Sequence, residues 1–250
     1  MINMRATLVY LGGKIAAINK PAGLSLATSK KDEEGAVTRL LVALSNSDRA
    51  KMPQGWSLVH RLDSGTSGLT LLALGPLARK ELSALFSSGA VHRRYLALVW
   101  GEPHSAVGRL AWALGPDPSD RRKMRVDASG KNAATRYRVL ASTPVASLLE
   151  LVPETGRTHQ IRVHLAEAGH SILGDDFYGR LRHIPMGISA AERRALQPGR
   201  PLLHAWKLDL PETKVSPPLS LEAPLPEDFK RVLKKLKIAF SEDQEIQPTP

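Results

Sequence analysis

Residues 60–69 place an aspartate two positions behind an arginine, on a turn rich in Gly, Ser and Thr. A short apolar stretch precedes this run and another follows it, which predicts two strands joined by a turn, with Asp63 at the bend. Gly65 and Gly68 permit positive φ angles and the close approach of another molecule. Such a bend can present a carboxylate into a cleft, where it would act as a nucleophile or as a base. On composition alone, an aspartate that only closes an Asx-turn is the more frequent case.

The chain is strongly basic. Its 250 residues include 35 Lys and Arg against 24 Asp and Glu, which gives a formal net charge of +11 and a pI of about 10.1. With 42% hydrophobic residues it can bury the core of one large domain or two small ones. The charge favours a polyanionic partner such as nucleic acid, although an anionic membrane surface would attract the same charge.

The sequence contains no cysteine, which excludes disulfides and thiolate zinc sites and is compatible with a reducing compartment. Residues 6–18 are mildly apolar but are broken by Gly12, Gly13 and Lys14, so they lack the continuous core of a secretory signal. No apolar run reaches the length of a membrane span. We therefore expect a cytoplasmic protein that does not bind a membrane.

The decapeptide His-Arg-Leu-Asp-Ser-Gly-Thr-Ser-Gly-Leu at residues 60–69 resembles the signature of the RluA-type pseudouridine synthases, in which the aspartate is catalytic. Further segments resemble the same family in the expected order, and the resemblance extends over roughly residues 8–230. Several motifs in the right order make a strong signal, whereas one short motif arises by chance. These segments are residues 20–24, 94–101, 155–165, 169–175, 178–179 and 203–206.

The resemblance implies an α+β fold, with a mixed, largely antiparallel sheet flanked by helices and an active-site cleft across it. It also implies an RNA pseudouridine synthase that isomerises a specific uridine of rRNA or tRNA without a cofactor or metal, on a nucleotide flipped out of its stack. We expect residues 1–240 to form the catalytic domain and residues 241–250 a disordered tail. The small RNA-binding domain that many family members carry upstream is not expected here. Because no heptad or apolar patch argues for pairing, we expect a monomer.

The expected catalytic residues are Asp63, Tyr95 and Arg162. Burial raises the pKa of a carboxyl group and a nearby guanidinium lowers it, so a reactive aspartate needs an arginine beside it. The resemblance points to Arg162 for this role and to Arg157 as the second candidate. On a helix, His159 would share a face with Arg162. Without the resemblance, Arg162 would be interpreted as an exposed helix charge.

Tyr95 lies in an apparent strand, on the same face as Ala97 and Val99, and from the pattern alone it belongs to the core. The resemblance places its ring against the target uracil, where the ring stacks or the hydroxyl assists proton transfer. It also implies that Arg61 fills the gap left by the flipped base, and a phosphate contact would suit its charge equally. With Arg61, we expect Arg157 and His159 to bind the substrate.

Periodicity and turn residues predict the elements that position these groups. Residues 116–132 lose apolar periodicity and carry the basic run 121–125, which predicts either an exposed loop that contacts phosphates or a solvated hairpin. Residues 180–200 are expected to be an irregular basic insertion. The expected strands cover residues 14–18, 94–100, 134–140 and 145–152. The expected helices have inward faces at Val37, Leu40, Leu41 and Leu44; at Leu77, Leu82, Leu85 and Phe86, between Pro76 and Gly89; along residues 158–168, ended by Gly169; and at Phe229, Val232, Leu233 and Leu236 within residues 227–240.

Other chemistries fit the sequence less well. His159 and His164 are one residue too far apart for the metalloprotease helix pattern, and its glutamate is missing. The Gly65–Leu69 segment lacks the closing glycine of a serine hydrolase, and Asp63 is the only acid between Gln54 and Lys80, whereas glycosidases use two. The main alternative is an RNA-binding or RNA-chaperone module without catalysis. An acid inside a basic cleft favours the enzyme, because binding alone does not require it.

Overall fold

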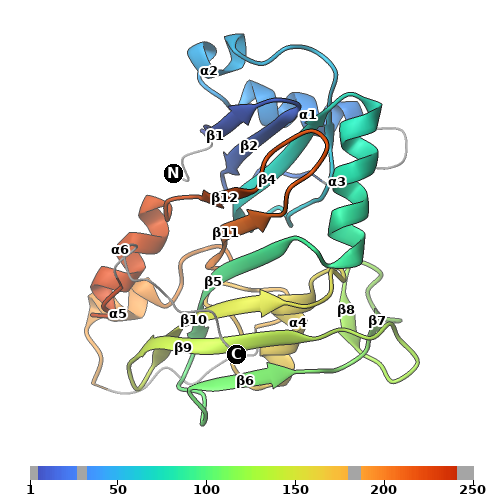
Figure 1. The fold of residues 1–250 in the computed structure, drawn as a ribbon. Helices are drawn as coiled ribbons and strands as arrows, with labels where there is room; N and C mark the ends of the chain where they lie inside the picture. Colours follow the sequence, from blue (N-terminus) through green and yellow to red (C-terminus); the bar gives the residue numbers. More distant parts are fainter. Residues whose placement is uncertain (1–4, 27–32, 180–186, 241–250) are drawn as a thin grey trace.

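A mixed sheet organises the computed structural model of the protein, which describes residues 5–26, 33–179 and 187–240 (Figure 1). Within these ranges ten strands form the sheet, in the order β1-β2-β4-β11-β5-β10-β9-β6, with β3 paired to β4 and β12 to β11. All pairs in the sheet are antiparallel except β4 with β11. The expected α+β fold is therefore confirmed. The strands of the sheet are β1 (Thr7–Gly12), β2 (Ile15–Lys20), β3 (Trp56–Leu58), β4 (Ser67–Leu74), β5 (His92–Trp100), β6 (Val107–Leu110), β9 (Thr135–Ser142), β10 (Ala146–Pro153), β11 (Leu203–Leu210) and β12 (Leu219–Glu222).

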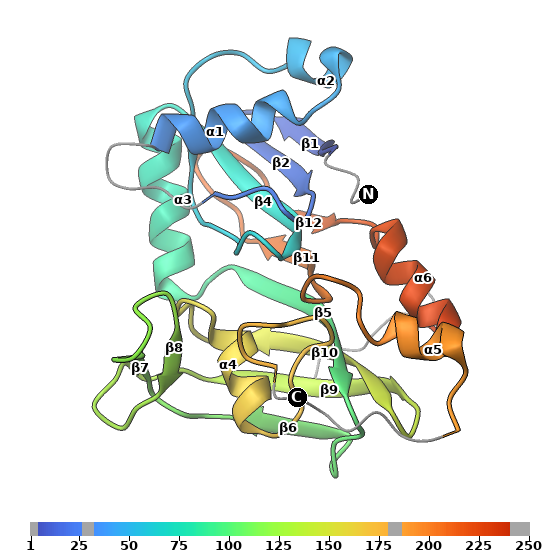
Figure 2. The same cartoon turned by 180° about the vertical axis from the view of Figure 1, so that it is seen from behind.

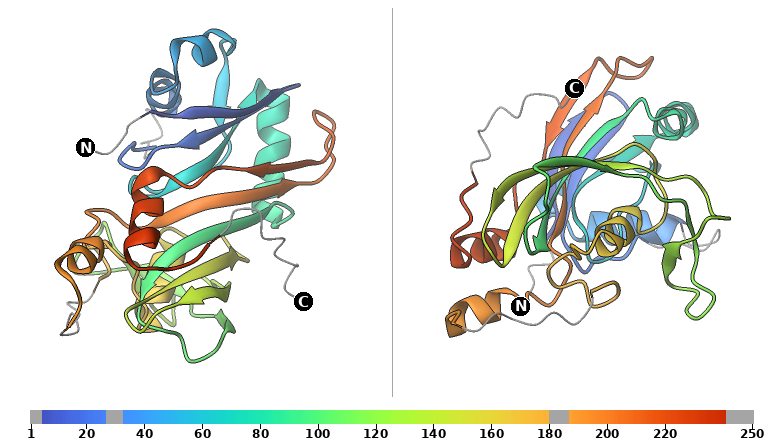
Figure 3. Two further views of the ribbon diagram at one scale, coloured as in Figure 1. Left: turned by 90° about the vertical axis from the view of Figure 1, so that its left-hand side faces the viewer. Right: turned by 90° about the horizontal axis from the view of Figure 1, so that it is seen from below.

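Helices cover both faces of the sheet, as the views in Figures 2 and 3 show. A separate hairpin of β7 (Leu114–Pro116) and β8 (Met124–Val126) lies beside α4. The basic run 121–125 thus belongs mainly to the turn of a hairpin, one of the two structures that the sequence left open. The helices are α1 (Glu33–Val42), α2 (Asn46–Ala50), α3 (Pro76–Ser88), α4 (Gln160–Glu167), α5 (Ala190–Ala195) and α6 (Glu227–Lys235).

Strand β5 shows how the sheet separates two cores. Its residues Tyr95, Ala97 and Val99 pack in one cluster with residues of α4, and Leu96 and Leu98 pack in another with residues of α5 and α6. This is the alternation that the sequence predicts for a strand buried on both faces. In the other half of the sheet, α1 packs against one face of β2 and β4, and α3 against the opposite face.

The parallel contact between β4 and β11 needs a glycine. Gly68 has φ 111° and pairs with Ala205. A Cβ atom at Gly68 would overlap the backbone of Ala205, so only glycine permits this approach. The contact fixes the start of β4 directly after the turn that carries Asp63.

Some element boundaries differ from the expectations. The helix expected over residues 158–168 begins at Gln160, because His159 has a positive φ of 53°. The last helix ends at Lys235 instead of residue 240, since Lys237 has a φ of 56°. Leu77 is 59% exposed and lies outside the core.

The expected irregular insertion at residues 180–200 is partly wrong. A short helix, α5, begins behind Ser189 and is stabilised by a capping box between Ser189 and Glu192. Residues 180–186 and the expected tail at 241–250 lie outside the described residues. In the described part of the chain, no helix has the length and apolar content that a membrane span requires.

Candidate active site

The turn after β3 carries Asp63 into the centre of the molecule. The Thr66 amide donates to the Asp63 carbonyl oxygen at 3.1 Å and closes the turn. The loop after β2 holds the turn from the other side: the Gly23 amide donates to the Ser64 carbonyl at 2.8 Å, and the Ser64 hydroxyl donates to the Gly23 carbonyl at 3.2 Å. The Asp63 side chain is 29% exposed and forms an ion pair with Arg162. Its carboxylate therefore does more than close an Asx-turn.

Arg162 joins two carboxylates from distant parts of the chain. Its Nη1 donates to Asp63 Oδ2 at 3.2 Å, and its Nε and Nη2 donate to Asp175 at 2.7 and 2.8 Å. Burial by itself would lower the pKa of Arg162, but the hydrogen bonds and charge of Asp175, together with Asp63, raise it above its ordinary value. Arg162 is therefore a permanent cation with a fixed orientation, and the exposed helix charge is excluded.

Asp175 is held in turn by the backbone that follows it. Its Oδ1 accepts the amides of Phe177 and Tyr178 at 3.1 and 3.2 Å, and its side chain is 1% exposed. The guanidinium carbon of Arg162 lies 4.9 Å from the centre of the Tyr178 ring. Asp175 and the two aromatic residues thus orient Arg162 toward Asp63.

His159 borders the same carboxylate. Its Nε2 lies 3.8 Å from Asp63 Oδ2, and its Nδ1 lies 2.6 Å from the Tyr178 hydroxyl, which accepts the Met124 amide. Burial lowers the pKa of His159, partly opposed by the charge of Asp63, so the imidazole is neutral at pH 7. We assign the tautomer in which the Tyr178 hydroxyl donates to Nδ1. The imidazole proton is then on Nε2, which faces Asp63.

Tyr95 contributes a buried phenol to the site. Burial raises its pKa, so the hydroxyl keeps its proton at neutral pH. The ring shares a hydrophobic cluster with Leu62, Ile161 and Leu203. These four side chains line the cavity described below and offer an apolar wall to a planar ring.

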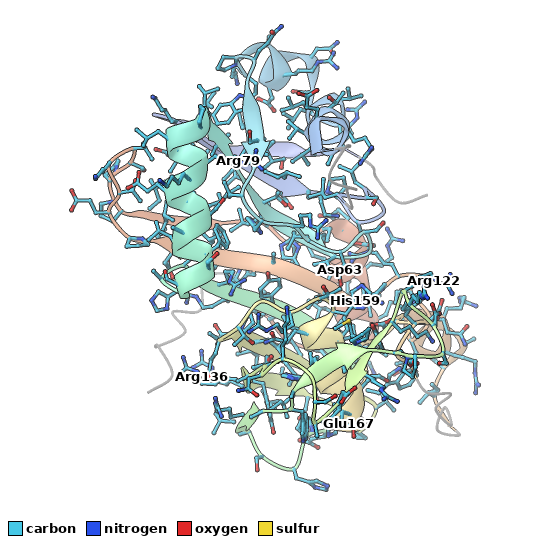
Figure 4. All side chains as sticks on the ribbon, turned by 90° about the vertical axis from the view of Figure 1, so that its right-hand side faces the viewer. Asp63, Arg79, Arg122, Arg136, His159 and Glu167 are labelled. Carbon is cyan, nitrogen blue, oxygen red and sulfur yellow. The ribbon has the colours of Figure 1, made fainter. Side chains whose placement is uncertain are left out.

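A cavity of about 910 Å³ brings the six predicted site residues together. It lies between the Asp63 turn, α3, β5 and the start of α4, and Figure 4 shows Asp63 and His159 next to each other in this region. Asp63 is the one acidic residue among the described residues that line it, so a polyanion is the expected occupant. The predicted residues in the lining are Arg61, Asp63, Tyr95, Arg157, His159 and Arg162, and the further cations are Arg93 and Arg122.

Arg157 does not pair with Asp63. Its Nε donates to the carbonyl of Asn132 at 3.1 Å, and its side chain is exposed at the rim of the cavity. Arg61 is also exposed at the cavity.

His164 lies apart from His159, because its ring forms hydrogen bonds with the Thr135 hydroxyl and the Trp112 carbonyl. Among the described residues, no group of three His, Asp or Glu side chains gathers as a metal site.

Lys20 and Asp175 support the site but were not predicted from the sequence. Lys20 is fully buried and donates to the carbonyls of Pro21, Leu24 and Ser64, which ties the loop after β2 to the Asp63 turn. Burial lowers the pKa of Lys20 to about 7, although the charge of Asp63 opposes the shift. Lys20 and Asp175 both lie in the family-like segments, and that was the available signal. Neither position indicated the partner that its side chain meets.

Comparisons with a family profile, with curated proteins and with solved structures all find RNA pseudouridine synthases. The family profile described as RNA pseudouridylate synthase matches residues 14–167. The chain is 35% identical to an uncharacterized RNA pseudouridine synthase of Chlorobaculum parvum, covering 95% of this chain and 76% of the relative. It is 36% identical to a ribosomal large subunit pseudouridine synthase D of Nitrosomonas europaea, covering 92% of this chain but 65% of that protein. The solved structure of human RNA Pseudouridylate Synthase Domain Containing 4 superposes with a TM-score of 0.73 at 27% identity, over 92% of this chain and 93% of that one.

Proposed function

Because the chain belongs to the RNA pseudouridylate synthase family and is an isomerase of RNA uridines, we propose that it converts one specific uridine of a structured RNA to pseudouridine with Asp63 as the catalytic residue. The observation that carries this proposal is the basic cavity in which Asp63, held by Arg162, is the single carboxylate among the described lining residues. A binding module has no use for an acid at that point, since it repels phosphates.

The reaction requires the bond between uracil N1 and ribose C1′ to break while the base stays bound. The base then turns, C5 bonds to C1′, the proton on C5 leaves to solvent, and N1 takes up a proton, so the product is an isomer of the substrate. Asp63 acts either as a nucleophile at the ribose or as a base there, and the Arg162 guanidinium donates a hydrogen bond to the carboxylate that both routes use. The atoms balance without an oxidant, a reductant or a cofactor.

The remaining residues bind and orient the nucleotide. Tyr95, with its protonated hydroxyl, stacks on the flipped uracil and assists proton transfer. His159, neutral and next to Asp63, contacts the substrate. Arg61 and Arg157, both exposed at the cavity, either fill the gap in the RNA or bind its phosphates.

The substrate that we favour is ribosomal RNA, since curated relatives carry the name ribosomal large subunit pseudouridine synthase D. Transfer RNA is the alternative. We propose a monomer with residues 1–240 as its catalytic domain, and the family profile matches residues 14–167 of this range. The cytoplasmic location stays a prediction.

The test is release of tritium from bulk ribosomal and transfer RNA labelled at C5 of uridine. We expect release by the parent protein and none by Asp63→Asn, which keeps the size of the side chain. Asp209→Asn is the matched control, because Asp209 pairs with Arg94 and does not line the cavity. Equal release by Asp63→Asn would refute the catalytic role. RNA binding by the parent protein without release from either RNA would indicate a binding module.

A further inference from the structure

Strand β5 carries two adjacent arginines with different environments. The Arg94 side chain donates to Asp209 Oδ2 at 3.1 Å and does not line the cavity. Arg93 lies two residues before Tyr95, on the same face of the strand, and lines the cavity with it. Only one of the two guanidinium groups is therefore neutralised by a carboxylate of the described chain.

The surroundings of Arg93 make it an uncompensated cation. Its guanidinium carbon lies 5.8 Å from the centre of the Phe86 ring, which stacks on His60 at 4.4 Å. Burial, with the charge of Arg93, lowers the pKa of His60 to about 3, so this ring is neutral. The Nε of Arg93 is buried and has no hydrogen-bond partner among the described residues. A partly buried cation without a partner lowers the stability of the folded protein. Proteins keep such a group where a ligand supplies the missing opposite charge.

Small polar residues line the same cavity as Arg93. Ser83 and Ser87 of α3 line the cavity together with Gly156, which lies in the loop before α4. A Cβ atom added at Gly156 would lie 3.5 Å from Arg93 Nη1, so the backbone of this loop runs beside the guanidinium. The one acidic residue among the described lining residues is Asp63, and it is bound by Arg162.

We propose that Arg93 binds a backbone phosphate of the RNA, next to the uridine that Tyr95 contacts. This inference rests on the proposed function. Residues two apart on a strand are separated by roughly 7 Å, so one nucleotide can contact both side chains. The planar guanidinium fits a phosphate through two parallel hydrogen bonds, and the Phe86 ring keeps its plane fixed. Arg93 thereby positions the substrate and takes no part in the chemical step.

The test compares Arg93→Gln, Arg93→Lys and the matched control Arg94→Gln. The first measurement is binding of bulk ribosomal and transfer RNA over a series of salt concentrations. The second is KM and kcat for tritium release from the same RNA labelled at C5. We expect Arg93→Gln to raise KM roughly tenfold or more, with a smaller change in kcat. The slope of log K against log salt should become shallower by about 0.7–0.9, as for the loss of one phosphate contact. Arg93→Lys should keep the salt slope, and Arg94→Gln should match the parent protein.

Thermal unfolding separates this proposal from a structural role. Arg93→Gln removes an unpaired cation, so its Tm should equal or exceed that of the parent protein. Arg93→Gln with the parent KM and salt slope would overturn the proposal. A loss of kcat at unchanged KM would also overturn it, because Arg93 would then act on Tyr95. The same holds if the Tm of Arg93→Gln falls and the loss of folded protein accounts for the lost activity. If the parent protein releases no tritium, the proposed function fails, while the salt slope of binding still decides whether Arg93 contacts phosphate.

Discussion

Arg162 donates to Asp63 with Nη1, while its Nε and Nη2 are both bound to Asp175. The Arg162 side chain is 10% exposed and that of Asp175 is buried, so this pair is the fixed part of the arrangement and Asp63 is the accessible part. The two carboxylates lie 99 and 13 residues away from Arg162 in the sequence. Asp175 thus determines the direction in which the guanidinium meets the proposed catalytic group.

Replacing Asp175 with asparagine should impair the reaction through Arg162. The side chain keeps its shape but loses the charge that orients the guanidinium, so we expect kcat to fall by roughly 10- to 100-fold. The free energy of unfolding should fall by about 2–4 kcal/mol, because a buried cation loses a partner. Glu150→Gln is the control, since Glu150 pairs with Arg138 at 2.6 Å and lies outside the cavity. If both variants lose stability and kcat equally, Asp175 has only a structural role.

Two substitutions of Tyr95 should separate its ring from its hydroxyl. Tyr95→Phe keeps the stacking surface and removes a phenol whose raised pKa keeps it protonated. We expect kcat to fall by roughly 100-fold with little change in KM. Tyr95→Ala should also raise KM by roughly tenfold or more, because stacking on the base is lost. Steady-state tritium release measures both effects, and a Tyr95→Phe protein with the parent kcat would limit Tyr95 to stacking.

Gly68→Ala should prevent stable folding. The new methyl group would meet the Ala205 backbone, and the φ of 111° disfavours any other residue. We expect a loss of more than about 4 kcal/mol in the free energy of unfolding. Gly89→Ala is the matched control, because Gly89 has a left-handed φ of 79° with no atom closer than 4.0 Å, and it should lose about 1–2 kcal/mol. Urea unfolding of the two variants measures the difference, and equal losses would show that β4 and β11 can separate without cost.

Acid should weaken the same strand contact through His204. This buried ring contacts the Ser67 hydroxyl at 2.9 Å and the Ala223 carbonyl at 3.0 Å, and burial lowers its pKa from 6.5 to about 4. Between pH 6.5 and 4 the unfolded chain binds more protons at this position than the folded protein does. The stabilising contribution is therefore complete above pH 6.5 and is lost as the pH falls through 4, by about 3 kcal/mol.

Urea unfolding at pH 7.5, 5.5 and 4.5 tests this expectation. The difference in unfolding free energy between the parent protein and His204→Gln should narrow as the pH falls. His104→Gln, at an exposed position, should follow the parent protein at each pH. A constant difference for His204→Gln across this range would contradict the expectation.

Local patterns in the sequence predicted much of the fold. Alternation assigned the two faces of β5 correctly, and Pro76 and Gly89 marked the two ends of α3. The start of α4 was placed two residues too early, because His159 has a positive φ, which is uncommon for every residue other than glycine. Contacts with Tyr178 and Asp63 accompany that conformation, and no local pattern indicates them.

The sequence by itself determined the family and the turn that carries Asp63, and it predicted six residues that line one cavity, because short motifs and strand periodicity are local properties. Only the tertiary structure decided that Arg162 and not Arg157 meets Asp63, and that Asp175 and Lys20 support the site. It also decided that Arg93 pairs with no carboxylate among the described residues. These are relations between residues far apart in the chain. They depend on the parallel contact of β4 with β11 and on the packing of α4 against β9 and β10, which together fix where each charge lies.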